Sequence, residues 1–168
     1  MKMHFILLFS IVLSGYSFAQ NNKIEIGKKA PEITISKPDG TSFSLSTLKG
    51  KLVLIDFWAT WCAPCVEEQP ELKKLYDVYS MQVKNNTFEI LGVSLDKNKE
   101  SWQKAIDRFN INWIQISDLK FWKSPVAKAY EVDELPFNII IDGQGTILAK
   151  NLHGKELEDF LNKNLTQK

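Results

Sequence analysis

Short apolar runs along the chain predict β-strands. Residues 52–58 form a nearly continuous run, and residues 88–95 a second one, which is typical of strands buried on both faces of a sheet. Residues 114–116 predict a third, short strand. Asp56 interrupts the first run with a carboxylate, which is costly to bury in a strand unless it has a partner or a purpose.

Two pairs of shorter stretches predict β-hairpins. Residues 31–36 and 42–45 flank the turn sequence PDGT, and residues 137–141 and 146–149 flank the turn sequence DGQG. Glycine and aspartate at such positions favour tight turns. We therefore expect one hairpin near the start of the folded chain and one near its end.

Apolar positions spaced three or four residues apart predict helices between these strands. The spacing follows Cys65, recurs over residues 102–109 and returns over residues 154–165. A Ser-Pro pair at residues 124–125 is a typical capped helix start and predicts another helix within residues 121–130. Alternating strands and helices without a repeat or linker predict one α/β domain, a mixed sheet with helices on both faces.

The first 19 residues have the pattern of a secretory signal peptide. Lys2 precedes an apolar run over residues 5–13, and the small residues Ser17 and Ala19 stand at the −3 and −1 positions of the expected cleavage site. The run is shorter than the ~20 residues that a membrane-spanning helix needs. We expect residues 1–19 to be removed and the protein to be exported to the periplasm or cell envelope.

The mature chain, residues 20–168, has the size of one domain, and its polar residues 20–30 predict a loose leader. Loss of Lys2 from the 21 basic residues leaves 20 against 20 acidic ones, and Arg108 is the only arginine. This balance argues against nucleic acid or anionic lipid as a partner. We expect a monomer without a cofactor or resident metal ion.

Cys62 and Cys65 are the only cysteines of the chain. Exported proteins normally use cysteines as cross-links, but a bridge around two intervening residues restrains the unfolded chain very little. A zinc site needs four ligands, and His153 is the only histidine in the mature chain. The pattern therefore favours a redox-active pair over a passive staple or a zinc site.

The two cysteines lie where a predicted strand ends and a helix begins. Unpaired backbone N–H groups and the helix dipole favour a thiolate there. We expect Cys62 to be more exposed and to attack the partner's disulfide, and Cys65 to resolve the mixed disulfide. Pro64 suits the first helical turn because its missing N–H donor would be unpaired anyway.

Cys65 must lose a proton in an apolar site, and two carboxylates are candidate acceptors. Asp56 lies six residues before Cys62, and Glu68 lies one helical turn beyond Cys65. Burial raises the pKa of a carboxyl group and makes it usable near neutrality. The simpler interpretations are a structural hydrogen bond for Asp56 and a solvated helix position for Glu68.

The sequence DFWA-x-WC-x-PC over residues 56–65, followed by Pro70, resembles the active-site strand, motif and kinked helix of the thioredoxin superfamily. With the export signal and Glu68, the hairpin leader of residues 30–51 resembles the TlpA/ResA-like branch of exported thiol-disulfide oxidoreductases. The resemblance spans residues 27–165. It implies a thioredoxin-like fold, with a central mixed sheet, flanking helices and an N-terminal β-hairpin extension.

The resemblance also implies roles for single residues. Leu135-Pro136 matches the family's cis-proline, which abuts the disulfide and pairs with the partner's backbone; from the residues alone, Pro136 predicts only the start of a strand. Trp61, Ala63 and Pro64 would complete the substrate-binding surface. Asp56 matches the buried acid of cytoplasmic thioredoxins and Glu68 that of ResA-like proteins, and the presence of both departs from either pattern.

The Ala63-Pro64 dipeptide is close to the Gly-Pro of reducing thioredoxins and unlike the His-containing motifs of strong oxidants. We therefore expect a reductant. Disulfide-containing envelope proteins would be its substrates, including apocytochrome c cysteines in cytochrome c biogenesis. In an oxidising compartment a reductant must be recharged, and the family implies a membrane thiol electron donor of the DsbD/CcdA type.

Two other functions compete with this interpretation. Peroxiredoxins share the fold, but their site needs a Thr three residues before the reactive Cys and an Arg that polarises the peroxide. Ala59 occupies the first position, and Arg108 lies in a predicted helix far along the chain. The second alternative is a redox-inert binding module on the same scaffold, against which the intact cysteine pair argues.

Overall fold

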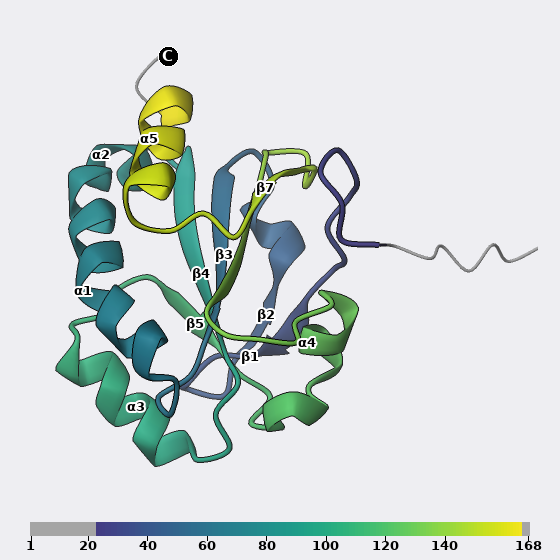
Figure 1. Cartoon of the computed structure of the whole chain (residues 1–168), viewed down its shortest axis with the longest axis vertical. Helices are drawn as coiled ribbons and strands as arrows, with labels where there is room; N and C mark the ends of the chain where they lie inside the picture. Colours follow the sequence, from purple (N-terminus) through teal and green to yellow (C-terminus); the bar gives the residue numbers. More distant parts are fainter. Residues whose placement is uncertain (1–22, 166–168) are drawn as a thin grey trace, which may run out of the picture.

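The computed structural model describes residues 23–165, and a five-stranded sheet forms their centre (Figure 1). The strand order is β5-β4-β3-β6-β7. β3 and β5 run parallel to β4, and β6 and β7 complete the sheet in antiparallel pairs. The bounds are β3 Leu52–Trp58, β4 Phe88–Ser94, β5 Ile114–Ile116, β6 Phe137–Ile141 and β7 Ile147–Lys150. The predicted mixed sheet is confirmed.

β3 is the middle strand, and its apolar side chains form the centre of the core. Leu54, Ile55 and Phe57 have no exposed surface, in agreement with the near-continuous apolar run. Truncation of one such side chain, as in Ile55→Ala, costs about 2–5 kcal/mol in other cores. The strand therefore fixes the position of the segment that follows it, which carries Cys62 and Cys65.

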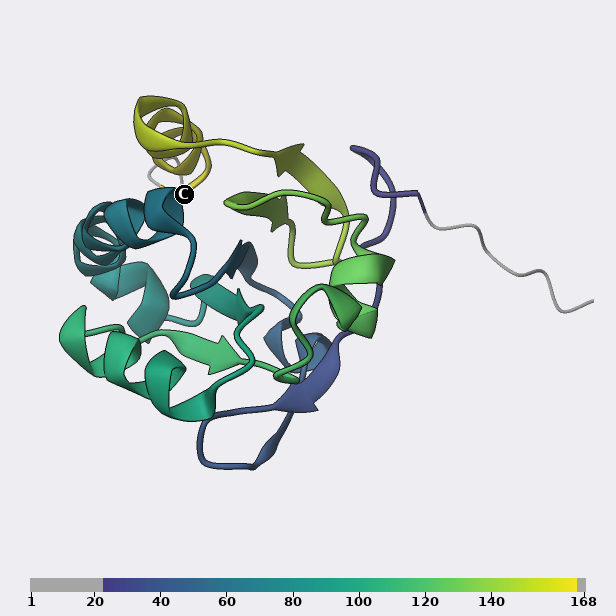
Figure 2. The ribbon, with the colours of Figure 1, turned by 60° about the horizontal axis from the view of Figure 1, so that its bottom comes forward.

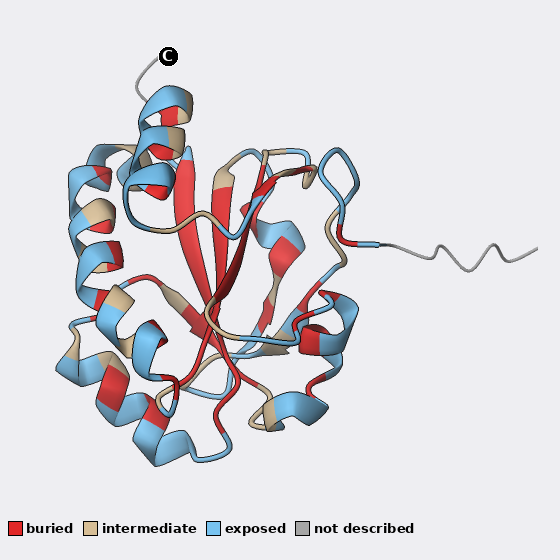
Figure 3. Cartoon of the chain, viewed as in Figure 1, coloured by how far each residue is buried: buried red, intermediate tan, exposed pale blue. Residues whose placement is uncertain are grey.

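Helices flank the sheet, and each buries one side only (Figure 3). The four that were predicted are α1 Ala63–Val78, α3 Lys99–Arg108, α4 Pro125–Ala129 and α5 Gly154–Leu165. Side-chain caps start three of them: Cys62 accepts from the Cys65 N–H at α1, Asn98 from the Ser101 N–H at α3, and Ser124 from the Ala127 N–H at α4. α1 begins at Ala63 and continues through Pro70.

Three further short helices complete the element list. The 3₁₀ turn η1, Leu45–Leu48, precedes β3, and a second 3₁₀ turn, η2, Phe121–Lys123, precedes α4. α2, Ser80–Lys84, was not predicted. It follows α1 after one residue, so its periodicity merges with that of the longer helix.

The predicted N-terminal hairpin is present as β1, Thr34–Ser36, and β2, Ser42–Ser44, which pair antiparallel. Gly40 has a φ of 86° in the turn, a conformation that glycine adopts without steric cost. The Ser117 N–H donates to the Ser36 carbonyl, so the hairpin is anchored beside the end of β5. It forms a separate two-stranded sheet, which Figure 2 shows next to the main one.

The prediction of a loose leader is wrong for residues 23–30. The Gly27 N–H donates to the Ile147 carbonyl, the Ile147 N–H donates to the Lys28 carbonyl, and Ile24 is buried. The segment thus docks along the edge strand β7 and satisfies backbone groups that would otherwise stay open. The polar composition of the segment concealed this because much of the attachment is made by backbone hydrogen bonds, with Ile24 as its buried side chain.

The predicted signal peptide, residues 1–19, lies outside the described residues. Across residues 23–165, none of the helices combines the length and the apolar character that crossing a membrane requires.

Candidate active site

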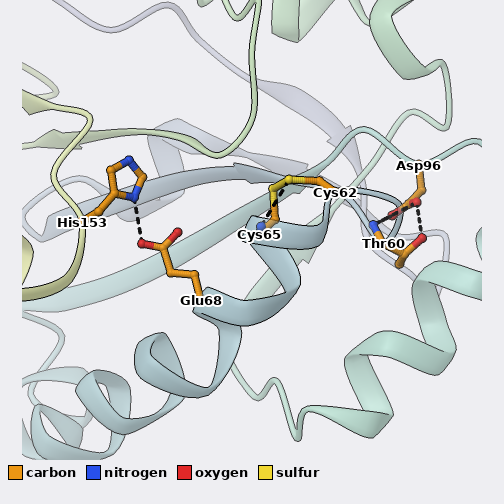
Figure 4. The surroundings of a disulfide bond; sticks show 6 residues. All are labelled: Thr60, Cys62, Cys65, Glu68, Asp96 and His153. Carbon is orange, nitrogen blue, oxygen red and sulfur yellow. Dashed lines mark hydrogen bonds and ion pairs between the residues drawn. A yellow bond between two sulfur atoms is a disulfide. The ribbon is translucent and has the colours of Figure 1, made fainter.

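The two cysteines form a disulfide at the junction of β3 and α1, with an S–S distance of 2.02 Å (Figure 4). Cys62 is the N-cap residue of α1, and its Sγ accepts a hydrogen bond from the Cys65 N–H at 3.2 Å. Cys62 is 6% exposed and Cys65 1%, so the expected order of exposure holds. A partner can therefore reach the pair only through Cys62.

The position of Cys62 also decides its chemistry. The first turn of a helix presents backbone N–H groups without carbonyl partners, and the helix dipole adds positive potential there. The bond from the Cys65 N–H shows that one of these groups already points at the Cys62 sulfur. In the reduced protein the same donor would stabilise a Cys62 thiolate, which is the nucleophilic form.

Asp56 is buried in β3, between Gly92 of β4 and Asn138 of β6. Its Oδ2 has no hydrogen-bond partner among the described residues. Burial and the nearby charge of Glu68 raise the pKa of Asp56 to about 7, although the Gln69 side chain opposes the shift. The structural hydrogen-bond interpretation is thus not supported for Oδ2, and the carboxyl group can exchange a proton near neutral pH.

Glu68 lies on α1, three residues beyond Cys65, and is partly buried. Its Oε1 lies 2.8 Å from Nδ1 of His153, which belongs to the connection between β7 and α5 (Figure 4). Glu68 is therefore not an ordinary solvated helix residue. Since it also acts on Asp56 electrostatically, the two candidate acids form one coupled group.

A shallow groove runs beside the disulfide. It is lined by Pro64, Glu67, Glu68, Glu71, Pro136, His153 and Gly154. The Leu135–Pro136 peptide bond is cis, as the family resemblance implied. Ala63 and Pro64 are exposed and Leu135 and Pro136 half-buried, so these four residues border the surface that a partner would meet.

Trp61 stands exposed on the other side of Cys62, with 46% of its surface accessible. Its ring packs edge-on against Phe121, with centroids 4.9 Å apart, and contacts Trp122 at 5.8 Å. Trp58, in contrast, is fully buried, and its indole N–H donates to Gln115. Of the two tryptophans, Trp61 is therefore the one that a docking protein can touch.

A buried carboxylate fixes the loop that leads to Cys62. Asp96 accepts hydrogen bonds from the Thr60 backbone N–H at 3.2 Å and the Thr60 hydroxyl at 2.6 Å (Figure 4). The Ser94 hydroxyl donates to its other oxygen at 2.8 Å. The carboxylate is thereby satisfied, and it anchors the turn two residues before the reactive sulfur.

The sequence motifs did not point to Asp96 or His153. Both come from loops that follow strands, and each reaches the site through contacts across a large separation: 36 residues for Thr60 and Asp96, and 85 for Glu68 and His153. The only available signal was that carboxylate and imidazole groups at strand ends of an α/β sheet tend to gather at one edge. Within the described chain, no three His, Cys, Asp or Glu side chains are grouped as a metal site requires.

A protein-family model described as the AhpC/TSA family matches residues 26–150. The thiol-disulfide oxidoreductase ResA of Bacillus cereus is 34% identical over 160 residues, 89% of this chain and 83% of that protein. A solved thiol-disulfide oxidoreductase from Bacteroides fragilis is 36% identical with a TM-score of 0.76, covering 82% of this chain and 100% of the other. The C-terminal domain of a putative thiol-disulfide oxidoreductase from Bacteroides thetaiotaomicron is also 36% identical, with a TM-score of 0.79, covering 86% and 99%.

Proposed function

This chain belongs to the AhpC/TSA family and is a thiol-disulfide oxidoreductase of the ResA type, and from that premise we propose that it is exported and reduces disulfides of envelope proteins. One observation supports the proposal above all: the Cys62–Cys65 disulfide caps α1 beside two coupled carboxyl groups, Asp56 and Glu68. That combination supplies an accessible nucleophile, a resolving thiol and a proton acceptor.

The reaction begins with the reduced pair. The Cys62 thiolate attacks one sulfur of the substrate disulfide, and the first substrate thiolate leaves and takes a proton from water. Cys65 gives its proton to the Asp56/Glu68 pair and attacks the Cys62 sulfur, which releases the second substrate sulfur as a thiolate that takes a proton from water. Two electrons have then moved to the substrate, and the protein holds the Cys62–Cys65 disulfide.

Other residues position the substrate in this proposal. The backbone beside cis-Pro136 pairs with the substrate chain, and Pro64 and Leu135 border the same approach. Trp61 and Ala63 contact the substrate on the other side of Cys62. Because Cys65 is almost fully buried, the substrate cannot bypass Cys62 to react with it.

Recharging requires an outside dithiol. We propose a membrane thiol donor of the DsbD/CcdA type, which would reduce the Cys62–Cys65 disulfide by the reverse sequence of exchanges. Envelope proteins with misformed disulfides, and apocytochrome c cysteines during cytochrome c biogenesis, are the substrates that fit an exported reductant. The protein would act as a monomer, since one chain carries both cysteines and both acids.

A thiol peroxidase is not proposed. Ala59 stands three residues before Cys62, where that chemistry needs a threonine, and is buried. Arg108 is exposed at the end of α3, stacked on Phe109. Neither residue offers the polar group that would activate a peroxide at Cys62.

Insulin reduction with a dithiol donor tests the activity. We expect turnover by the wild-type chain and none by Cys62→Ser, because the nucleophile is missing. Cys65→Ser is the matched control: it should form a mixed disulfide with insulin that persists, since nothing resolves it. Equal turnover by wild type and Cys62→Ser would reject the oxidoreductase mechanism and leave the redox-inert binding module as the better account.

A further inference from the structure

His153 lines the groove, lies outside the sequence motifs and has no role in the reaction as described. It lies between β7 and α5, and its Nδ1 is 2.8 Å from Oε1 of Glu68. Figure 4 shows the ring on the far side of Glu68 from the disulfide, with its second nitrogen turned away from the carboxylate. The imidazole thus contacts the acid but not the sulfurs.

Exposure increases in steps along the three titratable groups. Asp56 is 3% exposed, the Glu68 side chain 12% and the His153 side chain 37%. Asp56 is coupled to Glu68 by charge, and Glu68 is bonded to His153. The groups therefore form a continuous series from the buried strand to the groove and the solvent.

We propose that His153 is a positioning residue for the reaction, which orients the Glu68 carboxylate and carries protons between it and solvent. The inference rests on the proposed function, because it assigns a route to the proton that Cys65 must lose. Imidazole suits this role since it can take a proton on one ring nitrogen and release one from the other. No covalent bond or electron is exchanged at His153.

The proton balance follows from the steps above. Cys65 gives one proton to the acid pair when its sulfur attacks the mixed disulfide. Glu68 passes that proton to Nδ1 of His153 in the tautomer that carries its hydrogen on Nε2, and Nε2 then releases its hydrogen to water. The ring is left as the Nδ1–H tautomer, and proton exchange of its two nitrogens with solvent restores the starting tautomer. On reduction of the Cys62–Cys65 disulfide, the same path supplies a proton to Cys65 in the opposite direction.

The charges around the pair favour a basic group at this place. On α1, Glu67 and Glu71 line the groove together with Glu68, and on the opposite side Pro136 is uncharged. Asp56 of β3 is buried, and the charge of Glu68 acts on it. On α5, Lys155 forms ion pairs with Glu158 and Asp159. Among the described residues that line the groove, His153 is therefore the only one that can carry positive charge.

The backbone of His153 is held independently of its ring. Its carbonyl accepts from the Glu156 and Leu157 N–H groups and so belongs to the first turn of α5. A substitution of the side chain should leave this turn in place. Lys155, two residues along and exposed, offers a matched control for changes on the same helix.

The test separates the two sulfur steps within one reaction. A reduced protein treated with the aromatic disulfide dithiobis(nitrobenzoate) releases one coloured thiolate when Cys62 attacks and a second when Cys65 resolves. We expect His153→Ala to slow the second phase about tenfold, less than the ~10²–10⁴-fold typical of a direct general acid or base because His153 acts through Glu68, and to leave the first phase unchanged. Lys155→Ala should alter neither phase.

Added imidazole supplies the readout that a structural role would not affect. Free imidazole should accelerate the second phase of His153→Ala several-fold and should not help Glu68→Gln, because only the former keeps the carboxylate. In the Glu68→Gln background, the added change His153→Ala should have no further effect. His153→Gln, which keeps a hydrogen-bond partner but cannot carry a proton, should resemble His153→Ala.

Two results would overturn the inference. One is a second phase of His153→Ala that matches wild type between pH 5 and 9. The other is a slowed second phase that imidazole does not restore and that persists in the Glu68→Gln background, which would make the histidine structural. Either result leaves the proposed function intact, whereas a wild-type protein that releases no second thiolate would contradict the proposed function itself.

Discussion

Asp56 and Asp96 are two buried aspartates, the first in β3 and the second just after the neighbouring strand β4. Asp96 is 2% exposed and accepts hydrogen bonds from Thr60 and Ser94. Asp56 is 3% exposed, yet its Oδ2 has no partner in the described part of the chain, and its pKa is raised to about 7. The side chains and their burial are alike, and only their partners differ.

The difference in hydrogen-bond partners separates a structural buried carboxylate from one that can react. A carboxylate that accepts several hydrogen bonds stays charged and holds its donors in place. A carboxylate without them is held close to its neutral form and can exchange a proton at modest cost. Asp96 accordingly fixes the loop that carries Cys62, whereas Asp56 and Glu68 are the groups that we propose as acceptors for the proton of Cys65.

The largest expected effect comes from removal of both acids. Asp56→Asn with Glu68→Gln should slow resolution by Cys65 about 10²- to 10³-fold, because no acceptor for its proton remains. The two-phase release of thiolate measures the rate of resolution, and the rate of the first phase should stay within about twofold of the wild-type rate. Asp96→Asn serves as the comparison: a similar loss confined to its second phase would erase the distinction between the aspartates.

The next effect concerns stability. Asp96→Ala should lower the free energy of unfolding by about 2–4 kcal/mol, since the Thr60 N–H, the Thr60 hydroxyl and the Ser94 hydroxyl lose a buried acceptor. Asp56→Ala removes only the acceptor of the Gln69 side chain and should cost less than about 1 kcal/mol at pH 8. Denaturant unfolding of both variants in the oxidised state provides the values. Equal losses would show that Asp56 is also structural.

The pH dependence of stability gives a further test of the contrast between Asp56 and Asp96. The pKa of Asp56 is raised to about 7 in the folded protein, above its unfolded value of about 3.9, so folding favours its protonated form. Its stabilising contribution is fully present below about pH 4 and is lost as the pH rises through about 7, by about 4 kcal/mol in total. The free energy of unfolding of Asp56→Asn should therefore rise relative to that of wild type as the pH increases from about 4 to about 7. Stability curves that stay parallel would contradict the raised pKa.

The smallest effect should come from Thr60→Val. This change removes the hydroxyl bond to Asp96 but keeps the backbone N–H bond, so the free energy of unfolding should fall by about 1 kcal/mol. The rate of Cys65 resolution should not change. A loss above about 3 kcal/mol would mean that Thr60 contributes more than this single hydrogen bond.

The sheet and the cysteine pair could be predicted from the sequence because they rest on local patterns. The apolar run at residues 52–58 coincides with β3, and both hairpins formed where turn residues lie between alternating stretches. Asp56 was recognised for the same reason, as a charge inside an apolar run. The cis bond before Pro136 was anticipated only through the family resemblance, since nothing local to that residue specifies it.

Contacts between residues far apart in the chain could not be predicted from the sequence. The backbone bonds that attach residues 23–30 to β7 leave no mark on side-chain composition. Asp96 and His153 meet Thr60 and Glu68 only after the strands have aligned, and either residue could have been an ordinary loop position. The partners that separate Asp96 from Asp56 are therefore a property of the fold, although both aspartates are visible in the chain.

Whether the Cys62–Cys65 couple donates electrons is tested most directly by an equilibrium redox titration. The fraction of oxidised protein is measured against glutathione and thioredoxin standards, with Cys62→Ser as the blank. A reduction potential near thioredoxin's value of about −270 mV is the expected result for an envelope reductant. A potential near the value of about −120 mV typical of the strong oxidant DsbA would contradict it and reverse the direction of electron flow.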